Sequence, residues 1–198
     1  MTTEIQTIEC HPLTPFLPNV ARLLMLGSFP PPQKRWSMDF YYPNLNNDMW
    51  RVMGLIFFGD KNYFVDNAHK SFRKERIIDF LTEKGIALFD TANVVRRLKD
   101  NAADKFLEIV EATDISELLR QLSNCQTIAV TGQKAMNTLC TQLSVKEPAV
   151  GKSVEFMFDN CPIRLFRMPS TSRAYPLPLE RKAEMYETML KMIGIIEN

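Results

Sequence analysis

The chain contains very little histidine. His11 and His69 are the only two among 198 residues, and neither lies in a recognisable motif. Catalysis that depends on histidine is therefore not expected, and we interpret both residues as surface or loop positions.

Metal-binding patterns are also missing. The four cysteines are widely spaced and form no CxxC pair, which argues against zinc and iron–sulfur sites. We interpret them as buried free thiols: Cys10, Cys125, Cys140 and Cys161. The sequence predicts neither a metal nor a cofactor.

Long apolar runs are absent as well. No stretch approaches the roughly 20 apolar residues of a membrane helix, and the first ten residues, MTTEIQTIEC, do not resemble a signal peptide. The length and the 45% apolar content suit one globular domain over residues 1–198. We expect a cytoplasmic monomer without a membrane partner.

The glycine motifs of common nucleotide-binding and hydrolytic sites do not occur. GxxxxGK[ST], GxGxxG and GxSxG are all missing. The proline run at residues 30–32 also removes backbone N–H groups that a phosphate cradle would use. These absences argue against P-loop and dinucleotide-binding proteins and against serine hydrolases.

Charge is balanced overall but unevenly distributed. The net charge is +1, residues 161–182 carry five basic residues against Glu180, and residues 100–117 carry six acids against Lys105. The five basic residues are Arg164, Arg167, Arg173, Arg181 and Lys182. One face could therefore bind a polyanion. Ordinary solvated charge is an equally good interpretation of charge alone.

Four short apolar runs alternate with helical patterns. The runs lie at residues 22–27, 86–90, 127–132 and 163–172, the last leading into a loop. Helical periodicity and capping residues predict helices at 48–58, 71–85, 114–122, 133–143 and 178–195. This alternation predicts a three-layer α/β/α sandwich with a central four-stranded, mainly parallel sheet.

Ligands of such sheets bind beyond the carboxyl ends of the strands. The loops expected there are residues 27–33, 90–97, 131–134 and 169–175. Asp90 closes its strand, and we interpret it as a cap of the following segment, although a functional role is open.

The segment FYYPNLNNDMW, residues 40–50, combines aromatic rings with amides. Aromatic rings can stack on a planar base, a contact worth roughly 1–3 kcal/mol, and amides both donate and accept hydrogen bonds. The alternative is the edge of the core followed by a helix N-cap, supplied by Asn46 or Asn47.

Three ordered motifs resemble the uracil-DNA glycosylase superfamily, and most closely its mismatch-uracil and hypoxanthine (deoxyinosine) branch. They are LMLGSFPPP, FYYPNLNNDMWRVM and RMPSTSRAY. The resemblance spans most of residues 20–195 and implies the same sandwich fold. Pro31 stands where relatives often have glycine.

The first two motifs imply a set of catalytic and base-binding residues. Phe29 occupies the position where most of the superfamily has a water-orienting Asp or Asn. In the hypoxanthine branch a catalytic Asn precedes the Trp instead, which corresponds here to Asn47. The resemblance also implies a stacking ring, an assisting hydroxyl, and backbone N–H groups near the leaving base. The assisting hydroxyl is that of Ser28, a second catalytic residue beside Asn47, and the substrate contacts are Gly27, Phe29, Tyr41, Tyr42 and Asn44.

The third motif lacks the His that the best-known uracil enzymes carry in this loop. The resemblance implies a loop that enters the duplex, with Ser170, Thr171 and Ser172 near phosphates and Arg173 at its tip.

The resemblance implies a monofunctional DNA glycosylase of base excision repair. It would hydrolyse the N-glycosidic bond of uracil and/or hypoxanthine flipped out of DNA. A catalytically inactive member that binds a nucleic acid or a nucleobase is the main alternative, and hydrolysis of a free nucleoside is a third.

Overall fold

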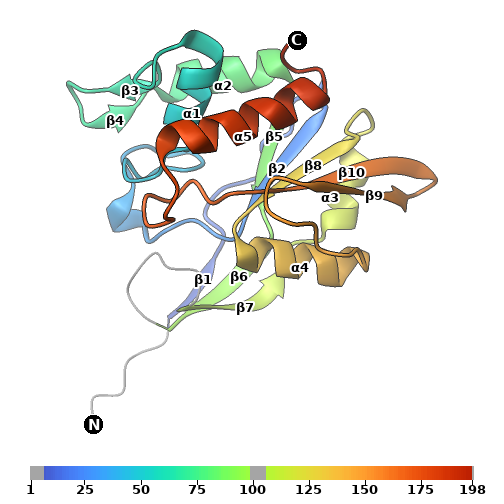
Figure 1. Ribbon diagram of the computed structural model, residues 1–198. Coiled ribbons are helices and arrows are strands. Elements are labelled where there is room, and N and C mark those ends of the chain that lie inside the picture. The colour runs from blue at the N-terminus through green and yellow to red at the C-terminus, as the bar shows by residue number, and fades with distance from the viewer. Residues whose placement is uncertain (1–6, 99–105, 198) are drawn as a thin grey trace.

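The computed structural model describes residues 7–98 and 106–197 (Figure 1). Its central sheet has five strands in the order β5-β2-β8-β10-β9. They are β5 (Ile86–Asp90), β2 (Leu23–Gly27), β8 (Thr127–Thr131), β10 (Cys161–Met168) and β9 (Ser153–Phe158). The first four are parallel and correspond to the four predicted strands, whereas β9 was not predicted and pairs antiparallel with β10.

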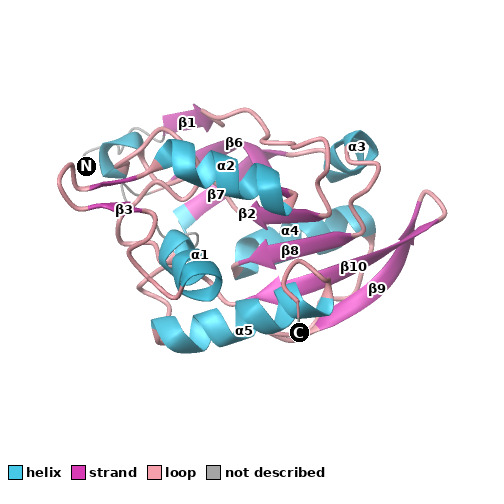
Figure 2. Cartoon of the chain, turned by 90° about the horizontal axis from the view of Figure 1, so that it is seen from above, coloured by secondary structure: helices cyan, strands magenta, loops and turns pink. Residues whose placement is uncertain are grey.

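Burial explains why the parallel strands form. Every residue of β2, β5 and β8 is buried, as expected for apolar runs covered on both faces. Helices α1 (Met49–Phe58), α2 (Lys74–Lys84) and α5 (Leu179–Met192) cover one face of the sheet. Helices α3 (Ile115–Gln121) and α4 (Gln133–Leu143) cover the other (Figures 1 and 2). The three-layer α/β/α sandwich is confirmed.

Local signals placed most helix ends correctly. Asp114 caps α3 by accepting a hydrogen bond from the Glu117 N–H, and α2 ends at Gly85 in the left-handed conformation. The predicted helix at 71–85 starts late because Ser71–Phe72 forms strand β4, which pairs with β3 (Val65–Asp66). A short 3-10 helix, η1 (Gln33–Arg35), follows the proline run.

A second sheet stands beside the first. It consists of β1 (Thr7–Cys10), β6 (Ala92–Arg97) and β7 (Leu107–Ala112), all antiparallel, in the order β1-β6-β7. The interpretation of residues 90–97 as a loop is therefore wrong beyond residue 91. Part of the acidic stretch at 100–117 lies outside the described residues.

The interpretation of all four cysteines as buried needs correction. Cys125 is buried and Cys140 partly so, but Cys10 and Cys161 are exposed, because they lie on the edge strand β1 and at the start of β10.

None of the helices within residues 7–98 and 106–197 has the length and apolar character needed to cross a membrane.

Candidate functional site

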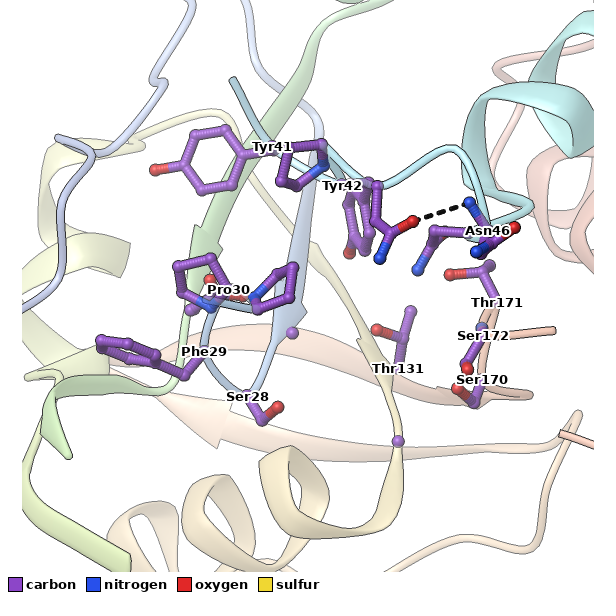
Figure 3. A pocket seen from close by; sticks show the side chains of 17 residues that line it. Ser28, Phe29, Pro30, Tyr41, Tyr42, Asn46, Thr131, Ser170, Thr171 and Ser172 are labelled. Carbon is purple, nitrogen blue, oxygen red and sulfur yellow. Dashed lines mark hydrogen bonds between the residues drawn. The ribbon is translucent and has the colours of Figure 1, made fainter. Parts of the chain in front are cut away.

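A polar cavity of about 150 Å³ opens at the carboxyl ends of β2, β5 and β8 (Figure 3). Ten of the eleven residues predicted for the site line it, and Arg173 is the exception. The lining residues are Gly27, Ser28, Phe29, Pro30, Pro31, Tyr41, Tyr42, Pro43, Asn44, Asn46, Asn47, Asp90, Thr131, Gly132, Ser170, Thr171 and Ser172. An engineered cavity of about this size holds benzene, so a single heterocyclic ring fits.

The two loops on one side of the cavity are joined through their backbones. Asn47 and Ser172 form an isolated antiparallel bridge, and the Asp48 N–H donates to the Thr171 carbonyl at 2.8 Å. The Arg173 N–H donates to the Asn46 carbonyl at 3.2 Å. The segment that carries the predicted catalytic Asn and the predicted DNA-binding loop therefore form one wall of the pocket.

Asn47 lines the pocket and also helps to start α1. Its Oδ1 accepts a hydrogen bond from the Met49 N–H at 2.9 Å. The formal N-cap residue, Asp48, makes no capping hydrogen bond through its side chain. Because an amide oxygen has two lone pairs and its nitrogen has two protons, Asn47 retains one acceptor position and two donors for a ligand or a water molecule.

The neighbouring amides differ in role. The Oδ1 atom of Asn44 accepts from the Asn46 N–H at 2.8 Å, which closes a tight turn. Asn46 is exposed, and its side chain forms no hydrogen bond with the described part of the chain. Of the three, Asn47 is held most firmly against the pocket.

Tyr42 points into the pocket above Thr131 (Figure 3). Its backbone is left-handed, with φ of 50°, a strained conformation that clusters at functional sites. Its buried hydroxyl has no well-formed hydrogen bond with any described residue. Burial, followed by the negative charge of Asp90, raises the pKa of Tyr42, with a partial offset from the Thr131 hydroxyl. The phenol therefore stays protonated and presents an unused donor to a ligand.

Tyr41 is fixed differently. Its hydroxyl donates to the Thr14 carbonyl at 2.8 Å, and its backbone carbonyl accepts from the Trp50 indole N–H at 3.1 Å. Burial, followed by the charge of Asp90, raises the pKa of Tyr41. Tyr41 thus supports the wall, whereas Tyr42 faces the ligand space.

Phe29 is buried in a small apolar cluster with Ala92, Val95 and Leu107 of the second sheet. Its ring cannot orient water, so the structure offers no replacement for the missing polar group at this position. The Phe29 N–H has no acceptor among the described residues and remains available at the pocket rim. Ser28 is buried and lines the same rim.

Asp90 and His11 form a buried pair that the sequence interpretation missed. The Nε2 atom of His11 lies 3.0 Å from Oδ2 of Asp90, and the His11 side chain is only 4% exposed. A carboxylate partner requires a proton on Nε2, while Nδ1 lies near the Leu13 N–H and carbonyl. His11 is therefore not a surface residue, whereas His69 is exposed.

The carboxylate of Asp90 faces the pocket instead of capping the following segment, which is strand β6. Its Oδ1 would lie 2.4 Å from a Cβ atom at Gly27, so this approach requires the glycine that ends β2. The structure assigns Asp90 to the pocket, and the interpretation of it as a cap is wrong.

The last residue of β8 and the residue after it complete the floor. Thr131 and Gly132 line the cavity, and neither was among the predicted site residues. The strand pattern predicted that residues 131–134 lie at this edge of the sheet. No other sequence signal pointed to Thr131 or Gly132.

The PSTSR segment lies partly under the surface. Thr171 is 2% exposed, whereas Ser170 and Ser172 are half-buried on the pocket wall. Arg173 is exposed, but its Nε donates to Oδ1 of Asp48 at 3.0 Å. Contact of these residues with DNA remains a prediction. Within the described residues, no group of three or more His, Cys, Asp or Glu side chains is placed to hold a metal ion.

Fold and site together define an α/β protein with a ring-sized polar pocket at the carboxyl edge of a mainly parallel sheet. Comparison with known structures finds the solution NMR structure of a "putative Uracil DNA glycosylase" from Methanosarcina acetivorans. The TM-score is 0.63 at 21% sequence identity, over 95% of this chain and 99% of that chain. Comparisons with family models and with curated proteins find no match. The two proteins therefore share a fold.

Proposed function

We propose that this protein is a monofunctional DNA glycosylase that removes uracil and/or hypoxanthine from DNA as a single domain. The observation that carries the proposal is the pocket itself. Asn47, Tyr42 and Asp90 line an open pocket that fits the six-membered ring that uracil and hypoxanthine have in common. The shared fold with a protein named as a uracil-DNA glycosylase supports this reading.

The pocket offers contacts suited to a flipped base. The Tyr42 ring presents a face for stacking, and its buried hydroxyl presents a donor for a carbonyl oxygen. An ionised carboxylate accepts hydrogen bonds and cannot donate them, and uracil and hypoxanthine both carry a ring N–H beside a carbonyl. Asp90, held by His11, is the acceptor for that N–H.

Cleavage of the N-glycosidic bond leaves positive charge on the sugar and negative charge on the base. The Phe29 N–H and the Ser28 hydroxyl stabilise the departing base at the rim. Asn47 orients the attacking water through the acceptor and donor positions that Met49 leaves unused. An amide is not a base, so the charge separation must be far advanced before the water reacts.

Oligonucleotides carrying uracil, hypoxanthine or xanthine, single-stranded and duplex, test the proposal. Alkali cleaves the strand wherever a base has been removed. We expect Asn47→Ala to lower the excision rate by about 100-fold or more, as loss of one positioned polar group does. The variant also loses the hydrogen bond from the Met49 N–H, at a cost of about 1 kcal/mol, so its unfolding midpoint is measured beside its rate.

Asn46→Ala is the matched control, because Asn46 lines the same pocket without a hydrogen bond from its side chain. The assignment is supported if wild type and Asn46→Ala excise the base and folded Asn47→Ala does not. Excision that persists unchanged in Asn47→Ala removes Asn47 from the mechanism.

Binding without cleavage is the second candidate function. Phe29 cannot position water, and one lone pair of Asn47 is already occupied by the Met49 N–H. Oligonucleotide binding with no strand breaks on any of the three bases would establish it in place of the glycosylase.

A further inference from the structure

A second hollow lies next to the candidate base pocket and is lined mostly by cations. It is formed where α1 and α5 begin and by the residues that follow α1. Its lining residues are Asp48, Arg51, Lys61, Arg173, Leu177, Leu179 and Lys182. Four positive side chains therefore face a single carboxylate.

That carboxylate is already neutralised. Lys182, only 1% exposed, places Nζ 2.9 Å from Oδ2 of Asp48, and Arg173 places Nε 3.0 Å from Oδ1. The Lys182 amine also donates to the Ser172 carbonyl at 2.9 Å. Both oxygens of Asp48 are therefore already paired, and its single negative charge, which also acts on Arg51, cannot balance all four cations of the hollow.

Arg51 and Lys61 carry the excess positive charge. Arg51 donates to the carbonyls of Leu45 at 2.9 Å and Asn47 at 3.5 Å, which are neutral groups. Within residues 7–98 and 106–197, neither Arg51 nor Lys61 forms an ion pair. Burial, and next the positive charge of Arg173, lowers the pKa of Arg51, so the two guanidinium groups repel each other.

The other basic residues of the 161–182 segment are compensated, which favours ordinary solvated charge for these three side chains. Each of the three has its own carboxylate partner: Arg164 with Glu155, Arg167 with Glu147, and Arg181 with Glu184. Of the five basic residues in this segment, only Arg173 and Lys182 line the hollow.

We propose that this hollow binds a backbone phosphate of the DNA strand whose base enters the pocket. Guanidinium groups recognise phosphate oxygens through paired N–H donors, and an added anion relieves the repulsion between Arg51 and Arg173. Arg51 reaches back to the Asn47 carbonyl, so the phosphate site adjoins the base site. The inference rests on the proposed function for its choice of DNA as the source of the phosphate.

Salt-dependent binding of a fluorescent, undamaged oligonucleotide duplex tests the site without requiring excision. Each phosphate contact contributes about 0.9 to the slope of log K against log salt. Lys61→Gln should lower that slope by about 1 and weaken binding severalfold. Arg51→Gln should do the same, because it removes the guanidinium charge together with its hydrogen bond to the Leu45 carbonyl.

Lys191→Gln is the matched control, because it removes the same charge from the far end of α5. Equal slopes for Lys61→Gln, Arg51→Gln and Lys191→Gln overturn the inference. Reduced slopes in both hollow variants support the phosphate site, even if no base is excised. Excision combined with unchanged slopes rejects the phosphate site but leaves the glycosylase proposal intact. Unfolding midpoints of all variants show whether a binding loss reflects misfolding.

Discussion

His11 and His69 make the same contact, imidazole to aspartate, in opposite environments. The His11 side chain is 4% exposed against Asp90, whereas that of His69 is 80% exposed against Asp66. A hydrogen bond to a buried carboxylate is costly to lose, because the carboxylate then lacks both water and a partner. The energetic weight of the two pairs should therefore differ sharply.

We expect His11→Ala to lower the free energy of unfolding by about 1–3 kcal/mol, which urea denaturation measures. Because Asp90 then loses its orientation, base excision should fall about tenfold or more. His69→Ala is the control and should leave both the unfolding midpoint and the rate unchanged. Equal effects of the two substitutions would contradict the role assigned to His11.

At the scale of elements, one buried ion pair joins α5 to the start of α1. Lys182 on α5 contacts Asp48 and the Ser172 carbonyl, so it ties the helix to both loops of the pocket wall. Removing one partner of a buried pair leaves an uncompensated charge and typically costs about 3–5 kcal/mol.

Lys182→Met should therefore lower the free energy of unfolding by about 3 kcal/mol, since Arg173 still balances part of the Asp48 charge. Lys191→Met, near the exposed end of the same helix, should change it by less than about 0.5 kcal/mol. Combining Lys182→Met with Asp48→Asn should recover part of the loss. A double variant that is simply additive would show that the two residues do not interact.

The elements that could be predicted are those whose signal is local. The strands β2, β5 and β8 are apolar at almost every position and stood out for that reason. Strand β6 was missed because buried and half-buried residues are interspersed along it without a regular period, and its partner β1 lies far earlier in the chain. Strand β9 is an edge strand with exposed positions.

Prediction of the site residues also depended on signals that are local in the sequence. The amides and aromatics of residues 40–47 are close in sequence, and a motif pointed to them. His11 and Asp90 are 79 positions apart, so no spacing pattern could pair them. Asp90 was interpreted as a cap because the strand after it was not recognised.

At the scale of the whole molecule, buried phenols link stability to alkaline pH. Burial is the largest cause that raises the pKa of Tyr41, Tyr42 and Tyr186 above the ordinary value of 10.0. The buried Cys125 thiol also links stability to alkaline pH, because burial raises its pKa to about 11. The tyrosines extend from the pocket wall to the middle of α5, so the effect belongs to the whole fold.

We expect full stability below about pH 9 and a steady loss above it. Once the pH exceeds the ordinary pKa values, the unfolded chain releases these protons while the folded chain retains them, so unfolding is favoured. Each such tyrosine adds a slope of up to about 1.4 kcal/mol per pH unit. Urea denaturation between about pH 8 and about pH 11 measures the total.

Tyr186→Phe, which removes the hydroxyl bonded to the Pro169 carbonyl, should be less stable at neutral pH but should lose stability less steeply as the pH rises. A slope that is the same in wild type and Tyr186→Phe would show that this phenol ionises freely in the folded protein.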